Sequence, residues 1–126
     1  MVLLRFFSVI IWGIWEVYLL NIVVPVYEAK ATLFRLLESM TKNKCAHGLG
    51  LILVFDHDGE NYDEEIAFAR AHFVTDIIKL AKNVGPGLAR QAGLNKCTKD
   101  FVMFADADDY FYPGALDSVE IGRAHV

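Results

Sequence analysis

Three aspartates near the end of the chain, Asp106, Asp108 and Asp109, lie within four positions of one another. Like charges this close repel, and a carboxylate leaves water at a cost unless a cation or a hydrogen-bond donor meets it. The preceding apolar run, residues 101–105, predicts a short strand buried on both faces of a sheet. Ligands of open α/β sheets bind at the carboxyl ends of strands, so this pattern predicts a metal or phosphate site. The alternative is a solvated turn before a helix that starts near residues 112–114.

Two further stretches carry residues that suit ligand binding. Asp56 and Asp58 follow the apolar run 49–55, where a simple Asp-Gly turn is the alternative interpretation. Residues 83–93 place two glycines and a proline before a helix that carries Arg90. Glycine lets a backbone approach a ligand, and the positive amino end of a helix favours phosphate. The stretch does not match the dinucleotide-binding fingerprint, because the third glycine of that pattern is replaced by Arg90.

The composition describes one modest globular domain. The 126 residues are 55% hydrophobic and 22% charged, with a net charge of −4. This acidic balance offers no basic surface for phosphate backbones, so we expect no nucleic-acid partner. Cys45 and Cys97 lie far apart and show no zinc-like or disulfide-framework spacing, which favours free thiols in a reducing compartment. We therefore expect a cytoplasmic location, with membrane association left open by the start of the chain.

The two ends of the chain are set apart from the fold. Residues 1–18 are long and apolar enough to suggest a bilayer span, but Arg5 and Glu16 count against it. A membrane anchor or signal-like segment, an apolar arm packed on the domain, and spurious translation all remain open. The tail 120–126 resembles a translated sequencing adapter and is treated as an artefact. We therefore expect the domain to occupy residues 19–119 and the chain to be a fragment of a longer protein.

Between these ends, short β-branched runs alternate with segments of helical periodicity. The pattern predicts strands at 21–27, 49–55, 74–80 and 101–105, and helices at 29–40, 63–73 and 87–96. Such alternation is typical of an α/β fold with a mainly parallel sheet. The loops after the first, second and fourth strands then share one edge of the sheet, which brings the acidic stretches together.

Four stretches in this order resemble the nucleotide-sugar-binding half of the inverting family-2 glycosyltransferases, which have the Rossmann-like GT-A fold. They read IVVPVYEA, LILVFDHDGEN, NVGPGLARQAG followed by the strand ending in DADD, and YFYPGAL. The resemblance runs from about Leu20 to Val119. The second stretch departs from the usual pattern of adjacent acids, because His57 separates Asp56 from Asp58 and Glu60 follows the glycine.

The resemblance implies a role for each of several residues at the nucleoside end of the donor. Pro25, Tyr27 and Glu28 are expected to line the nucleobase pocket, where a tyrosine ring can stack and a carboxylate can accept hydrogen bonds. Either Asp56 or Asp58 is expected to contact the base, and the departure from the family pattern leaves open which of the two does so.

The resemblance also implies roles at the diphosphate end. Arg90 is expected near the nucleotide, Asp106 near the ribose or the water shell of a metal, and Asp108 on the metal itself. Mn²⁺ or Mg²⁺ suits these hard oxygen ligands. The implied donor is a nucleotide sugar, in this family most commonly a uridine-diphosphate sugar although others occur. It is transferred with inversion to an acceptor hydroxyl of a glycan, lipid or protein. The family's catalytic base lies in the later half of its domain, so no catalytic residue is expected in this chain.

Two alternatives from other classes remain at this stage. A phosphohydrolase of the haloacid-dehalogenase kind would use Asp56 as nucleophile and Asp58 as acid/base, although that motif normally lies on the first strand. A non-enzymatic, membrane-anchored fragment would use its acidic residues only for solubility. The phosphohydrolase interpretation leaves the glycine-rich stretch before Arg90 unexplained.

Overall fold

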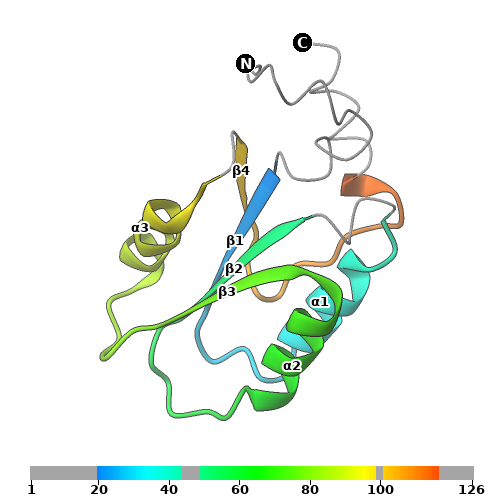
Figure 1. Cartoon of the computed structure of the whole chain (residues 1–126). Helices are drawn as coiled ribbons and strands as arrows, with labels where there is room; N and C mark the ends of the chain where they lie inside the picture. Colours follow the sequence, from blue (N-terminus) through cyan, green and yellow to red (C-terminus); the bar gives the residue numbers. More distant parts are fainter. Residues whose placement is uncertain (1–19, 44–48, 99–100, 117–126) are drawn as a thin grey trace.

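A computed structural model describes residues 20–43, 49–98 and 101–116 (Figure 1). Three helices alternate with four strands in these residues: β1 Leu20–Val26, α1 Leu33–Met40, β2 Gly50–Phe55, α2 Asp63–His72, β3 Val74–Lys79, α3 Pro86–Lys96 and β4 Phe101–Phe104. The predictions made for residues 1–18 and 120–126 lie outside the described residues. The type and order of all seven predicted elements are confirmed.

The four strands form one parallel sheet in the order β3-β2-β1-β4. Val23 of β1 pairs with Ile52 of β2 on one side and with Phe104 of β4 on the other. The chain therefore adds β2 and β3 on one side of β1 and then returns to add β4 on the other. This Rossmann-like arrangement confirms the predicted α/β class with a parallel sheet.

Helices cover both faces of the sheet, with α1 and α2 on one face and α3 on the other (Figure 1). The larger core cluster lies between the sheet, α1 and α2, and the smaller one lies under α3 and contains Val23, Ile52, Val54 and Ala89. β1 and β2 are buried on both faces because they are central. Gly93 allows α3 to approach the sheet closely, since a Cβ at this position would collide with Val23.

The structure corrects two local predictions. The strand at 101–105 was expected to be buried on both faces, but β4 alternates between half-buried and exposed residues, and Phe104 is 44% exposed. β4 lies at the edge of the described sheet, and only Phe101 and Met103 pack against the core. The first helix was expected from residue 29, but residues 29–32 form a turn because Thr32 has a non-helical φ of −123°.

Candidate functional site

The sheet opens a cleft at its carboxyl-terminal edge, between the ends of β1 and β4. The amide of Ala105 donates to the carbonyl of Val23 at 3.0 Å, whereas β1 continues to Val26 alongside β2 alone. The backbone N–H and C=O groups of successive strand residues point to opposite neighbouring strands, so those of Val23 and Pro25 point toward β4. Pro25 lies beyond the last residue paired with β4, and because proline has no N–H, no backbone donor is left without a partner there. The cleft therefore lies where the chain reverses its direction of strand addition.

The cleft has a volume of about 460 Å³, within the range of small-molecule sites. Seven of the eight predicted site residues line it: Pro25, Tyr27, Glu28, Asp56, Arg90, Asp106 and Asp108. Residues from the turn before α3, Asn83, Gly85 and Pro86, complete the same wall. Asp58, the eighth, lines a neighbouring hollow with His57, Tyr62 and Lys79 instead.

Asp56 lines the cleft and is buried, with 2% of its surface exposed. Its two carboxylate oxygens accept hydrogen bonds from the backbone amides of Val84, at 2.7 Å, and Gly85, at 2.9 Å. Asn83 donates from its side chain to the backbone carbonyl of Asp56 at 3.2 Å. Asp56 thus fixes the glycine-rich turn that leads into α3, and Gly85 provides the positive φ of 93° that this turn requires.

Asp58 connects the loop after β2 to the loop after β1. Its Oδ2 accepts from the amide of Glu28 at 2.6 Å and from the hydroxyl of Tyr62 at 2.7 Å, and its Oδ1 accepts from the amide of Glu60 at 2.9 Å. Partial burial alone raises the pKa of a carboxyl group, but these hydrogen bonds outweigh burial and leave the pKa of Asp58 below its usual value. Asp58 is therefore ionised at neutral pH and already engaged by protein donors.

The three aspartates after β4 form a tight acidic turn. One carboxylate oxygen from each of Asp106, Asp108 and Asp109 lies within 4.8 Å of the others, and all three residues are exposed. Asp109 accepts from the amide of Asp106 at 2.7 Å and donates its own amide to the carbonyl of Asp106 at 2.9 Å. Arg90 of α3 pairs with the carboxylate of Asp106 at 3.1 Å. Three convergent carboxylates suit a hard divalent cation, so this donor set fits Mn²⁺ or Mg²⁺.

Helix α1 and the residues just after it hold the acidic turn and the segment that follows, through side chains that the sequence analysis missed. Arg35 donates to the carbonyl of Asp108 at 3.0 Å. The buried Ser39 hydroxyl accepts from the amide of Phe111 at 3.0 Å, and the buried Asn43 accepts from the amide of Leu116 at 2.8 Å. Arg35, Ser39 and Asn43 recur every four residues, although Asn43 lies beyond the end of α1, and this helical spacing of polar residues is the signal that could have revealed them.

Comparison with known proteins identifies the family. The model of the family described as "Glycosyl transferase family 2" matches residues 21–119, which include every described strand and helix except the first residue of β1, Leu20, and every residue that lines the cleft. The chain belongs to glycosyltransferase family 2. The resemblance seen in the sequence is thereby confirmed, and the match does not support the alternative phosphohydrolase interpretation.

Several relatives share this family-2 domain. The chain is 31% identical over 101 residues to an uncharacterized glycosyltransferase of Haemophilus influenzae, covering 80% of this chain and 33% of the relative. It is 32% identical over 99 residues to the pre-mycofactocin glycosyltransferase of Mycobacterium tuberculosis, covering 79% of this chain and 20% of the relative. The chain therefore spans a third or less of the length of these curated relatives.

Solved structures show the same fold as the family-2 domain. S. aureus TarS 1–349 in complex with UDP superposes with a TM-score of 0.78 at 23% identity, over 84% of this chain and 32% of that one. The complex of the same TarS fragment with UDP-GlcNAc gives a TM-score of 0.76, also at 23% identity, over 84% of this chain and 31% of that one. Within the described residues, no helix combines the length and the apolar character needed to cross a membrane.

Proposed function

We propose that this domain binds a nucleoside-diphosphate sugar, most simply a uridine-diphosphate sugar, for inverting transfer to an acceptor hydroxyl. One observation carries the proposal: the cleft at the reversal of strand order combines an aromatic and acidic loop after β1 with Arg90 and an acidic turn after β4. The family match and the ligands named for the two TarS complexes, UDP and UDP-GlcNAc, support the choice of donor.

The nucleoside end of the donor is assigned to the loop after β1. Tyr27 is 48% exposed and lines the cleft, so its ring is available to stack on a base. Glu28 offers carboxylate acceptors, and Pro25 offers an apolar surface. Asp56 is proposed as the acid that reaches the base, because it lines the cleft and Asp58 does not.

The diphosphate end is assigned to Arg90, the amino end of α3 and the acidic turn. A guanidinium and a helix amino terminus both favour phosphate oxygens. Asp108 and Asp106 are the proposed ligands of Mn²⁺ or Mg²⁺, with Asp109 beside them. When bound, such a cation stabilises the negative charge that develops on a departing nucleoside diphosphate.

The acceptor side of the reaction is not assigned to any residue of this chain. Inversion needs a base that removes the proton of the acceptor hydroxyl, and the family resemblance locates that base in the later half of the domain. The curated relatives are at least three times longer than the matched region. We therefore propose donor binding as the part of the reaction that these residues perform, and assign the transfer step to none of them.

Calorimetric titration of UDP, with and without Mn²⁺, tests the proposed function. We expect metal-dependent binding that Asp108→Asn reduces at least about tenfold, because a metal ligand is removed. Asp76→Asn is the matched control, since Asp76 is an exposed acid on β3 outside the cleft. Absence of metal-dependent UDP binding in a folded wild-type chain would overturn the proposal, as would an equal loss in both variants.

A further inference from the structure

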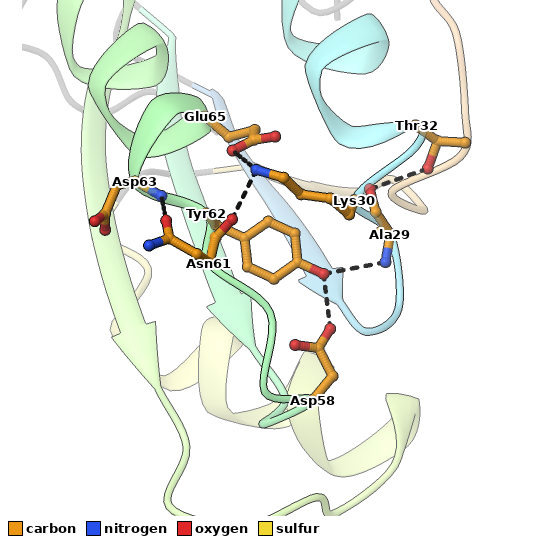
Figure 2. A network of polar contacts seen from close by, with 8 residues as sticks. All are labelled: Ala29, Lys30, Thr32, Asp58, Asn61, Tyr62, Asp63 and Glu65. Carbon is orange, nitrogen blue, oxygen red and sulfur yellow. Dashed lines mark hydrogen bonds and ion pairs between the residues drawn. The ribbon is translucent and has the colours of Figure 1, made fainter.

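A network of polar contacts joins three consecutive residues after β1, Glu28, Ala29 and Lys30, to the loop after β2 and the first turn of α2. Figure 2 shows the contacts of Ala29 and Lys30. The amide of Glu28 donates to Asp58, and the amide of Ala29 donates to the hydroxyl of Tyr62 at 3.1 Å. The ammonium group of Lys30 donates to the carboxylate of Glu65 at 2.9 Å and to the backbone carbonyl of Asn61 at 2.7 Å. Each of the three residues is therefore bonded to a partner 30 to 35 positions away in the sequence.

The network is needed because Glu28 has a backbone conformation that non-glycine residues disfavour. Its φ is 49°, in the left-handed region. Such a conformation persists only where the surroundings hold it, and the Glu28 amide here meets an ionised carboxylate at 2.6 Å. Asp58 thus stabilises a strained residue that itself lines the cleft.

Tyr62 fixes the position of Asp58 in turn. Its hydroxyl donates to Asp58 and accepts from Ala29, so one oxygen joins both loops (Figure 2). The ring is 6% exposed, packs on Phe55 with a centroid distance of 5.0 Å, and has the Lys30 ammonium 5.6 Å from its centre. This packing gives the hydroxyl little freedom to leave its two partners.

We propose that Asp58 and Tyr62 are positioning residues for the donor's nucleoside, acting through the backbone of Glu28 and Ala29 rather than by touching the ligand. The inference rests on the proposed function, because it supposes that Tyr27 and Glu28 meet the base. It also gives Asp58 a role different from a base contact. Its place outside the cleft and its hydrogen bonds to the Glu28 amide and the Tyr62 hydroxyl support this role.

Binding of two probes to the 126-residue chain tests the inference. Tyr62→Phe removes only the hydroxyl, and Asp58→Asn removes the charge and part of the acceptor capacity. With Mg²⁺ present, we expect both variants to lose about tenfold in affinity for UDP and less than about twofold for inorganic pyrophosphate, which has no nucleoside. Tyr112→Phe is the matched control, because Tyr112 is 76% exposed and makes none of the hydrogen bonds of the network.

Amide hydrogen exchange on the same variants gives a second readout that does not need a ligand. We expect the amides of Glu28 and Ala29 to exchange faster in Tyr62→Phe and Asp58→Asn, while those of α3 stay unchanged. Equal losses for UDP and pyrophosphate, unchanged UDP affinity, or unchanged exchange at Glu28 and Ala29 would each overturn the inference. Absence of UDP binding in the wild-type chain would instead count against the proposed function, and exchange would still decide whether the two residues hold the loop.

Discussion

At the scale of single residues, ionisation of the Tyr62 hydroxyl should change the free energy of unfolding. Burial raises the pKa of its hydroxyl, and the hydrogen bond to Asp58 raises it further, to about 12 from 10.0. A group whose pKa is raised by folding stabilises the protein below its unfolded pKa, and this contribution is lost as the pH rises through the folded pKa. Between these two pKa values we expect wild-type stability to fall relative to Tyr62→Phe by up to about 2 kcal/mol.

Urea unfolding of both proteins across that alkaline range provides the measurement. Lysines distant from the ring titrate alike in both chains. The difference between the two curves therefore reports the tyrosine together with Lys30, whose ammonium lies 5.6 Å from the ring centre. Parallel curves would show that the Tyr62 hydroxyl is not held by Asp58 and Ala29 as the structure has it.

The two aspartates after β2 show what single residues reveal in a sequence and what they conceal. Both Asp56 and Asp58 were predicted to lie near the base because both follow the second strand. Their partners differ: the amides of Val84 and Gly85 for Asp56, and Glu28 and Tyr62 for Asp58. Most of these partners lie about 30 positions away in the sequence, and no local pattern encodes them. The sequence therefore could not distinguish Asp56, which lines the cleft, from Asp58, which does not.

At the scale of elements, the sequence predicted type and order because apolar periodicity depends on which faces are covered. Exposure of β4 could not be predicted in this way. A continuous apolar run is equally compatible with a central strand and with an edge strand, and only the strand order decides between them. The start of α1 was misplaced for a related reason, since Glu28 and Ala29 are held by the distant residues Asp58 and Tyr62.

The close packing of α3 on the sheet leads to a prediction about that helix. A methyl group at Gly93 would collide with Val23 and lie 3.1 Å from Val54, whereas nothing lies within 4 Å of the same position at Gly87. We expect Gly93→Ala to destabilise the domain by about 1–3 kcal/mol through overpacking. Gly87→Ala should be neutral or stabilising by up to about 1 kcal/mol, because alanine favours a helix.

Chemical denaturation of both glycine variants checks these two predictions. Each variant adds one methyl group to α3, toward the sheet at Gly93 and into open space at Gly87. Because α3 carries Arg90, Gly93→Ala should also weaken UDP binding when the helix moves. Equal stability of the two variants would mean that α3 does not lie against Val23 and Val54 as closely as the structure has it.

At the scale of the whole molecule, the distribution of charge should make donor binding depend on the proposed divalent cation. The protein carries a net charge of −4, and the described residues that line the cleft include four acids, Glu28, Asp56, Asp106 and Asp108, against the single cation Arg90. A diphosphate is itself strongly negative, so like-charge repulsion opposes its entry. A divalent ion at the acidic turn reverses the local sign, and donor and metal should therefore bind cooperatively.

This coupling gives a prediction for thermal unfolding of the whole chain. A ligand that binds only the folded state stabilises it by about 2.7 kcal/mol at 100 times its Kd, which for a domain of this size raises the Tm by roughly 10 °C. We expect that rise with UDP and Mn²⁺ together, little change with UDP alone, and reversal by a chelator. Binding linkage is reciprocal, so UDP must raise the affinity for Mn²⁺ by the same factor that Mn²⁺ raises the affinity for UDP. An equal rise in Tm with UDP in the presence of chelator would show that Arg90 and the amino end of α3 are sufficient to bind the diphosphate, and that the three aspartates serve another purpose.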